Sequence, residues 1–186
     1  MVRLFVALEI PDELRAELAA LQSGVPGARW VDPDNFHITL RFIGEIDGAQ
    51  ARDLDEMLLG IRAPSFPVQI AGVGNFGDAK PRVLYAAVAP NPALEHLKKK
   101  VDSAVARAGI ALEGGKFRPH VTLARFSGRE MAGHHLAQFM ASHGLLRSEP
   151  FFVRQFSLFS SLTRPEGSIY TLEADYPLTF TSRALG

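Results

Sequence analysis

One short pattern, repeated once, limits the folds open to this chain more than any other feature. His-x-Thr-Leu begins at His37 and again at His120, each time within a run of apolar and β-branched residues. Such runs are typical of β-strands, in which alternate side chains share a face. His37 and Thr39 are therefore expected on one face of their strand, and His120 and Thr122 on one face of theirs. The pattern predicts two strands that each present an imidazole beside a hydroxyl.

The surroundings of the two motifs also repeat. Three pairs of landmark residues are 79, 83 and 85 positions apart: Arg3 with Arg82, His37 with His120, and Phe66 with Phe151. Nearly constant offsets in the same order indicate an internal duplication. We expect a single domain over 1–186, built from one unit at about 3–89 and a second at about 82–178. The strand at 82–89 would end the first unit and begin the second.

Each unit is expected to contain the same elements in the same order. The first unit should contain a strand at 3–10, a helix from 12, the motif strand at 36–43, a helix at 48–62, and a hairpin of 66–76 with 82–89. The second should contain a helix from 91 to about 109, the motif strand at 117–126, a helix at 130–143, and a hairpin of 151–161 with 168–178.

These elements predict an α+β fold with two duplicated lobes. Each lobe should have a mostly antiparallel sheet with helices on its outer face. Lobes related by a pseudo-two-fold axis would bring the two motif strands face to face across a groove. Duplication thus predicts one shared site between the lobes.

Composition excludes several functional classes. The chain has no cysteine, which excludes disulfides and thiolate chemistry, and no apolar run approaches the roughly 20 residues of a membrane helix. Its start does not resemble a signal peptide, so we expect a cytoplasmic protein that does not bind membranes, and we expect a monomer.

Twenty basic residues balance twenty acidic ones. A polyanionic partner would therefore be held locally, as by one phosphate. The basic residues near the motif strands or their likely neighbouring strands are Lys80, Arg82, Lys116, Arg118 and Arg125.

Paired histidines suit acid–base catalysis at a phosphodiester. With a pKa near 6.5, one imidazole can accept a proton while a second donates one. In-line phosphoryl transfer needs both, because the nucleophile loses a proton and the leaving oxygen gains one. Threonine hydroxyls beside them can stabilise the charge on the non-bridging oxygens. A single His-x-Thr would more often be structural, but two copies in matching places favour a catalytic site.

Metal and nucleotide cofactors are not expected. Neither motif strand carries Asp or Glu, and the Gly-Gly-Lys-Phe at 114–117 lacks the spacing of a P-loop. His96 is expected to face solvent on a helix. His134, His135 and His143 are expected to be exposed or helix-end polar residues.

Taken together, the motifs and their settings resemble the 2H phosphoesterase superfamily, which is defined by two His-x-Thr/Ser-x motifs. Within it the chain is similar to the RNA 2′,3′-cyclic phosphodiesterases, also called 2′-5′ RNA ligases or LigT-like proteins. The similar segments are RLFVALEIP, FHITLRFIGE, PRVLYAAV, KFRPHVTLARF and the closing YPL. The resemblance covers almost the whole chain.

This resemblance implies hydrolysis of a 2′,3′-cyclic phosphate at an RNA end to a 2′-phosphate, without metal or cofactor. It also implies 2′-5′ joining when a 5′-hydroxyl replaces water, and tRNA fragments are one candidate source of such ends. His37 and His120 would be the acid–base pair, with Thr39 and Thr122 holding the phosphate. The sequence leaves the two roles open; we favour His37 as the acid for the 3′-oxygen and His120 as the base for water.

The motifs differ just beyond their threonines. Arg41 has the parity of His37 and is expected to point into the groove as a phosphate contact. Arg125 has the opposite parity in its strand and reaches the groove only if the strand twists or bulges. The resemblance keeps Arg125 as a second phosphate contact. Phe42 and Phe126 follow these arginines, and we expect both in the core rather than stacked on a base.

Three alternatives stay open. The same chemistry could act on 2′-5′ oligoadenylate or on a cyclic ADP-ribose phosphate, since groove-wall residues choose the substrate. A non-catalytic module that binds RNA ends is the third, although intact motifs argue against it.

Overall fold

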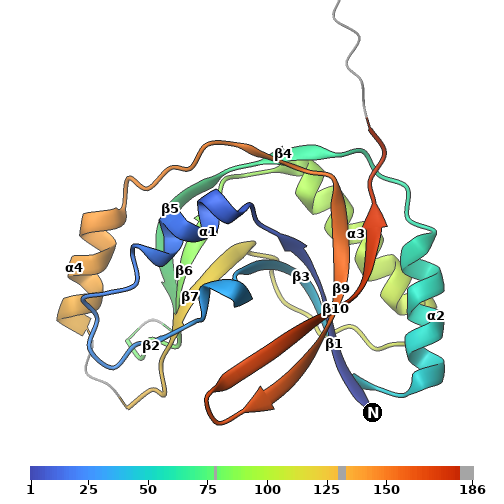
Figure 1. Ribbon diagram of the computed structural model, residues 1–186, viewed down its shortest axis with the longest axis horizontal. Coiled ribbons are helices and arrows are strands. Elements are labelled where there is room, and N and C mark those ends of the chain that lie inside the picture. The colour runs from blue at the N-terminus through green and yellow to red at the C-terminus, as the bar shows by residue number, and fades with distance from the viewer. Residues whose placement is uncertain (78, 130–132, 181–186) are drawn as a thin grey trace, which may run out of the picture.

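All four α-helices of the described residues pack against one face of a mostly antiparallel sheet (Figure 1). The structure is a computed structural model, which describes residues 1–77, 79–129 and 133–180. In chain order the elements are β1 (Val2–Glu9), α1 (Asp12–Ala19), β2 (Arg29–Trp30), the short 3₁₀ helix η1 (Pro33–Asn35), β3 (His37–Ile46), α2 (Gly48–Leu59), β4 (Phe66–Val68), β5 (Ile70–Phe76), β6 (Val83–Val88), α3 (Pro92–Arg107), β7 (His120–Arg125), α4 (Gly133–His143), β8 (Phe151–Val153), β9 (Gln155–Arg164) and β10 (Gly167–Pro177).

The strand order is symmetric about the two motif strands. The sheet runs β10-β9-β1-β3-β7-β6-β5, with β2 paired to β7 off this path. β1 flanks β3 as β6 flanks β7, and β9 and β5 lie one strand further out. The motif strands meet at a single register pair, Ile38 with Val121, which joins the two half-sheets into one. The expected α+β fold with a mostly antiparallel sheet and helices on the outer face is confirmed.

We propose that this symmetry reflects an internal duplication with units at about 3–89 and 82–178. β1, α1, β3, α2, β4 and β5 correspond in order to β6, α3, β7, α4, β8 and β9. The corresponding strands β4 and β8 pair with each other as a separate ribbon. β6 both begins the second unit and closes the β5–β6 hairpin. In chain order β10 closes the second hairpin as β6 closes the first, but no strand of the described residues occupies the matching place in the other half-sheet, so β10 is an extra edge strand.

Local signals explain where the helices begin. α2 starts with a capping box, in which Asp47 and Gln50 each accept a hydrogen bond from the other's backbone N–H. α3 starts at Asn91, whose side chain accepts from the backbone of Leu94, and Pro92 occupies the first turn. The expected start of the helix at 130–143 lies outside the described residues, and α4 is described from Gly133 onward.

The strands differ from expectation in two places. Each predicted first hairpin strand is split, 66–76 into β4 and β5 and 151–161 into β8 and β9. The second motif strand begins at His120 rather than at 117, because 110–119 has no regular structure and Pro119 lacks the N–H that a ladder needs. The two hairpins themselves, β5–β6 and β9–β10, are as expected.

Side chains on the two faces of the sheet form separate clusters. The large core between sheet and helices includes Leu8, Ile38 and Val121, all fully buried. A small cluster of Phe5, Ala7 and Phe159 lies on the opposite face. No α-helix of the described residues covers this second face, so a cleft can form on it. None of the described helices is both long and apolar enough to cross a membrane.

Candidate active site

The two motif strands place their His–Thr pairs in one cleft of roughly 130 Å³. His37 and Thr39 line it from β3, and His120 and Thr122 line it from β7. Their leucines and the intervening apolar residues face the helices and are buried. Two His–Thr pairs that lie 83 positions apart in the sequence thus converge on one small space.

Each motif histidine is held from behind by a backbone carbonyl two residues earlier. His37 Nδ1 lies 2.8 Å from the oxygen of Asn35, and His120 Nδ1 lies 2.6 Å from the oxygen of Arg118. A carbonyl oxygen can only accept, so Nδ1–H is the donor in both bonds. The tautomer is thereby fixed, and Nε2 of each ring is left to accept or donate a proton.

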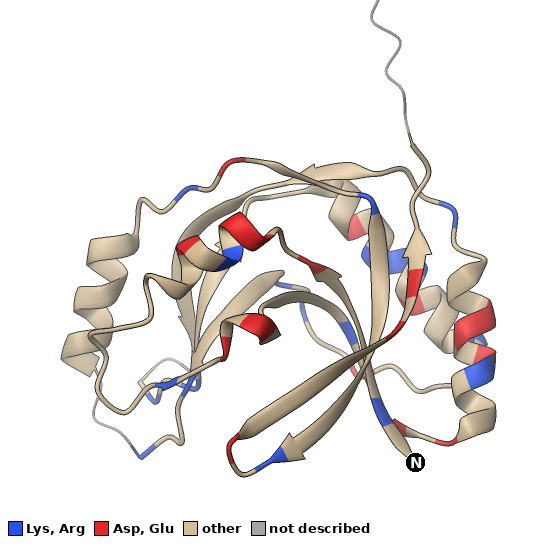
Figure 2. Ribbon diagram, viewed as in Figure 1, with Lys and Arg blue, Asp and Glu red and all other residues tan. Residues whose placement is uncertain are grey.

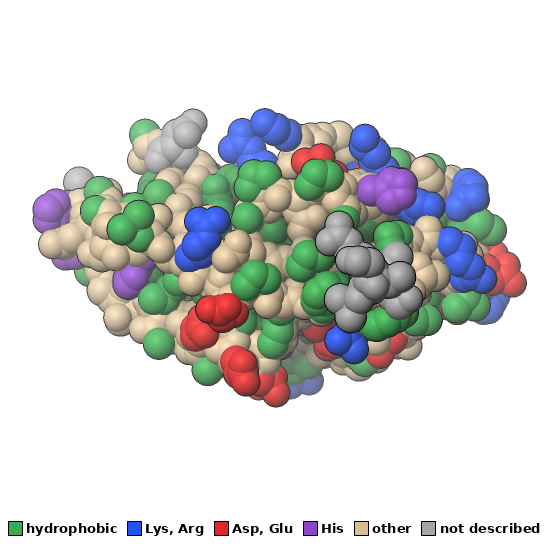
Figure 3. All heavy atoms as spheres, turned by 90° about the horizontal axis from the view of Figure 1, so that it is seen from above, with side chains coloured by type: hydrophobic (Ala, Val, Ile, Leu, Met, Phe, Trp, Pro, Cys, Tyr) green, Lys and Arg blue, Asp and Glu red, His purple; other side chains and the backbone are tan. Residues whose placement is uncertain are grey.

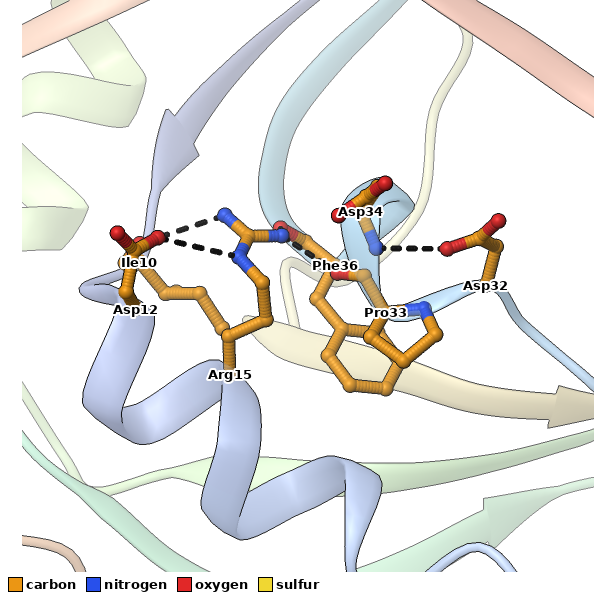
Figure 4. Close-up of polar contacts among 7 residues, drawn as sticks. All are labelled: Ile10, Asp12, Arg15, Asp32, Pro33, Asp34 and Phe36. Atoms are coloured by element: carbon orange, nitrogen blue, oxygen red, sulfur yellow. Dashed lines mark hydrogen bonds and ion pairs between the residues drawn. The ribbon is translucent and has the colours of Figure 1, made fainter.

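Arg15 on α1 braces the segment that precedes His37 (Figure 4). Its guanidinium donates to the carbonyls of Pro33 and Phe36, and to a third carbonyl at the end of β1. Asn35, whose carbonyl holds the His37 ring, lies between the first two of these acceptors. Arg15 therefore fixes the backbone that orients the imidazole.

Both imidazoles have lowered pKa values, which favours their neutral form near pH 7. Burial, with a smaller contribution from the Arg15 guanidinium, lowers the pKa of His37 from 6.5 to about 4. Burial, with the Arg125 guanidinium, likewise holds the pKa of His120 below its usual value. A bound phosphate anion has the opposite effect, because it favours the protonated form of a nearby ring.

A β-bulge just beyond the first motif corrects the orientation expected for Arg41. Thr39 and Arg41 pair with consecutive residues of β1, so Leu40 is an extra residue in β3. The side chains that follow such a bulge exchange faces. Phe42 therefore lines the cleft, and Arg41 points away from it.

A second bulge lies at the matching place in β7. Thr122 and Ala124 pair with consecutive residues of β6, so Leu123 is the extra residue. Arg125 consequently lines the cleft, as expected if the strand bulged. It lies five residues after His120, as Phe42 lies five residues after its own motif histidine.

The two phenylalanines that follow the motifs have different environments. Phe126 is 5% exposed and belongs to the core, as expected. Phe42 is 70% exposed at the cleft, so the expectation that it lies in the core is wrong. An exposed aromatic ring beside a cleft suits contact with a ligand.

Arg41 joins a charged cluster behind the cleft. Its Nε donates to Asp102 Oδ1 at 2.8 Å, and its Nη1 donates to the backbone carbonyl oxygen of Glu113 at 2.8 Å. Lys98 donates to the same Asp102 oxygen at 2.8 Å and lies 5.3 Å above the Phe117 ring. Burial alone would raise the pKa of Asp102, but these two cations hold that pKa below its usual value. The cluster ties β3 and α3 to the loop that leads into β7.

An aromatic ring packs against each imidazole. Phe159 lies 4.6 Å from the His37 ring centroid, and Phe76 lies 5.0 Å from that of His120. Phe159 is on β9 and Phe76 on β5, the strands that correspond in the two half-sheets. These rings contribute to the burial that lowers the pKa of each histidine.

The β9–β10 hairpin supplies site residues that sequence reasoning missed. Tyr170 of β10 lines the cleft 5.6 Å from the His37 ring.

Asn35 of η1 is a second cleft-lining residue that sequence reasoning missed, and its side chain donates to the Ser168 carbonyl at 2.8 Å. Asn35 acts on His37 through its backbone, which any residue type could do, so only its place two residues before the motif could have indicated it.

The remaining histidines lie away from the cleft. Histidine side chains are visible at the surface over α4, at the left end of Figure 3. His134 and His135 are exposed there, and His96 is exposed on α3. Across 1–77, 79–129 and 133–180, no three His, Cys, Asp or Glu side chains are grouped as metal ligands.

Comparison with protein families gives one match over most of the chain. The family model described as LigT like Phosphoesterase matches residues 8–85 and again 87–170. The two matched segments contain one motif each.

Individual relatives agree with this match. The chain is 30% identical over 173 residues to an RNA 2′,3′-cyclic phosphodiesterase of Archaeoglobus fulgidus, covering 91% of this chain and 96% of the relative. It is 31% identical over 189 residues to a protein of the same name from Thermus thermophilus, covering 95% and 90%. Among solved structures, E. coli LigT complexed with 3′-AMP superposes with a TM-score of 0.79 at 25% identity, covering 96% of this chain and 98% of that one.

Proposed function

Because the chain belongs to the LigT-like phosphoesterase family and is a hydrolase of that class, we propose that its paired histidines open the 2′,3′-cyclic phosphate at an RNA end and leave a 2′-phosphate. The reaction uses water as nucleophile and needs no metal ion. With a 5′-hydroxyl in place of water, the same geometry joins two RNA ends through a 2′-5′ linkage.

One observation carries this proposal: two imidazoles with the same fixed tautomer line a single cleft with two threonine hydroxyls. One Nε2 can take the proton of water while the other gives a proton to the departing oxygen. Thr39 and Thr122 are placed to donate to the non-bridging oxygens. The cleft lining includes the cation Arg125 and, among the described residues, no carboxylate that would serve a metal.

The two ends of the cleft favour different roles for the histidines. Phe5, Phe42 and Tyr170 give the His37 side an apolar, aromatic wall that suits a nucleoside. The ribose oxygen that leaves phosphorus then faces His37, and water approaches in line from His120. In this assignment His120 Nε2 accepts the proton of water, the P–O3′ bond breaks, and His37 Nε2–H protonates the 3′-oxygen. The pKa of His37 is about 4 without a bound anion. His37 therefore becomes protonated when the phosphate anion binds beside it, which makes it the acid.

Replacing either motif histidine tests the proposal. His37→Ala and His120→Ala should each lower cleavage of an RNA with a 2′,3′-cyclic end by ~10²–10⁴, the usual contribution of a general acid or base. The product of the unaltered protein should be a 2′-phosphate, and EDTA should leave its rate unchanged. Product analysis by chromatography against synthetic 2′- and 3′-phosphates provides the measurement.

His96→Ala is the matched control, because this histidine is exposed on α3 away from the cleft. It should retain full activity, and all three variants should keep the circular dichroism of the folded protein. Normal turnover by either motif variant would reject the two-histidine mechanism. Loss of activity on removing metal would reject metal independence alone.

A further inference from the structure

Arg29 lies beside Arg125 on the neighbouring strand, next to the residues that line the cleft. β2 pairs with β7 in the register Arg29 with Arg125 and Trp30 with Ala124. Residues directly opposite in an antiparallel pair project from the same face of the sheet. Arg29 also has the parity of Val31, which lines the cleft together with Arg125. The two arginines therefore stand side by side on the cleft face.

Two neighbouring guanidinium groups are electrostatically unfavourable. Like charges directly opposite in a sheet repel each other. The ion pairs found in the described part of the chain engage Arg3, Arg15 and Arg41, but neither Arg29 nor Arg125. No side-chain hydrogen bond satisfies either guanidinium there. Figure 2 shows blue segments gathered beside β2 and the end of β7, with the red segment of η1 nearby. An anion between them would relieve the repulsion.

Phe42 and this arginine pair lie at opposite ends of the cleft. β3 and β7 are antiparallel and meet at Ile38 and Val121. Because the strands run in opposite directions from that pair, Phe42 and Arg125 extend away from each other. One end of the cleft is thus aromatic and the other is cationic.

A terminal nucleotide has the same two-ended form. The base on C1′ and the 5′-carbon on C4′ flank the C2′–C3′ edge that carries the cyclic phosphate. With that phosphate between His37 and His120 and the base against Phe42, the 5′-oxygen points toward the cationic end. In an RNA chain this oxygen carries the next phosphodiester, whereas in a free cyclic mononucleotide it carries only hydrogen.

We propose that Arg29, together with Arg125, binds the phosphodiester on the 5′ side of the terminal nucleotide. The preferred substrate is then the end of an RNA chain and not a free 2′,3′-cyclic mononucleotide. This inference rests on the proposed function, which supplies the phosphate between the histidines.

Two substrates that differ only in this phosphodiester test the subsite. Arg29→Gln should lower kcat/KM by about tenfold on a dinucleotide with a 2′,3′-cyclic end, as expected for one charged hydrogen bond. It should leave kcat/KM on the cyclic mononucleotide unchanged. On a dinucleotide whose linkage is an uncharged methylphosphonate, the variant and the unaltered protein should be equal. Arg29→Lys should retain part of the preference, and the exposed Arg62→Gln should change nothing.

Equal losses on both substrates, or no loss on either, would overturn the subsite. A separate measurement keeps this result apart from failure of the proposed function. Calorimetric titration with the 2′-phosphorylated dinucleotide product needs no turnover, and Arg29→Gln should weaken its binding about tenfold relative to the 2′-phosphorylated mononucleotide. If the unaltered protein binds both products but opens neither cyclic substrate, the hydrolysis proposal fails while the subsite stands.

Discussion

Phe42 and Arg125 show how single residues differentiate two nearly equivalent half-sites. Each follows its motif histidine by five positions and reaches the cleft only because a bulge intervenes. One offers a π face and the other a fixed positive charge. The exposed ring of Phe42 packs near Phe5, with their centroids 6.1 Å apart, and leaves its outer face open.

Removal of the Phe42 ring should weaken substrate binding more than turnover. Base stacking on an aromatic side chain is worth ~1–3 kcal/mol, so Phe42→Ala should raise KM for a cyclic dinucleotide by about tenfold with kcat largely kept. Steady-state kinetics measures this split. Phe152→Ala is the control, because that ring is 61% exposed on β8, away from the cleft. A fall in kcat with KM unchanged would contradict a stacking role.

At this scale the sequence predicted the residues that obey simple alternation. His37, Thr39, His120 and Thr122 lie where a period of two places them. Arg41 does not, because the extra residue at Leu40 inverts the parity, and the amino-acid types around a bulge carry no clear sign of it.

The connection between α3 and β7 shows how elements cooperate. The segment 110–119 has no regular structure, yet it ends in the Arg118 carbonyl that holds His120. Arg41 pins this loop by donating to Glu113 while also bonding Asp102 on α3. The motif strand β3 thereby helps to position the histidine of the other half.

Arg41→Lys should disturb His120 without disturbing His37. Lysine can keep its charge beside Asp102, but its single ammonium cannot also span to Glu113 as the guanidinium fork does. We expect kcat to fall about fivefold, in line with a hydrogen bond of ~1 kcal/mol. The imidazole ¹⁵N signals of His120 should shift while those of His37 stay in place.

Arg3→Lys is the matched control for this experiment. Arg3 pairs with Glu45 on the exposed β1–β3 surface, so its loss should leave both histidine spectra and kcat unchanged. If Arg41→Lys shifted both histidines alike, the clamp would be a general support of the fold and not a positioning device for one ring.

Helices were easier to predict than strands and loops. Capping residues such as Asp47 and Asn91 are local signals, so the starts of α2 and α3 could be read directly. The division of 66–76 into β4 and β5 depends on which distant strand each piece pairs with. That information is not contained in the segment itself, because β4 pairs with β8 and β5 with β6.

At the scale of the whole molecule, buried neutral histidines couple the site to stability. The pKa of His37 is about 4 in the folded protein, against about 6.5 in an unfolded chain. As pH falls from about 6.5 towards 4, the unfolded state takes up a proton that the folded state refuses. The free energy of unfolding therefore decreases over that range.

His37→Gln should remove this part of the acid sensitivity. The free energy of unfolding of the unaltered protein should fall by roughly 2 kcal/mol more than that of the variant between pH 7 and pH 5. Urea unfolding at a series of pH values measures the difference. The control His96→Gln, at an exposed position, should show the same pH dependence as the unaltered protein. If His37→Gln also showed the same pH dependence as the unaltered protein, the pKa of His37 would not be lowered by folding.

A cleft with true two-fold symmetry would bind an elongated ligand equally well in two opposite orientations. The two orientations would then be equivalent, and neither histidine would have a role of its own. β10, the extra edge strand, removes this equivalence because it adds Tyr170 to the half of the cleft that contains His37. This extra edge strand thereby sets the orientation in which an RNA end would bind.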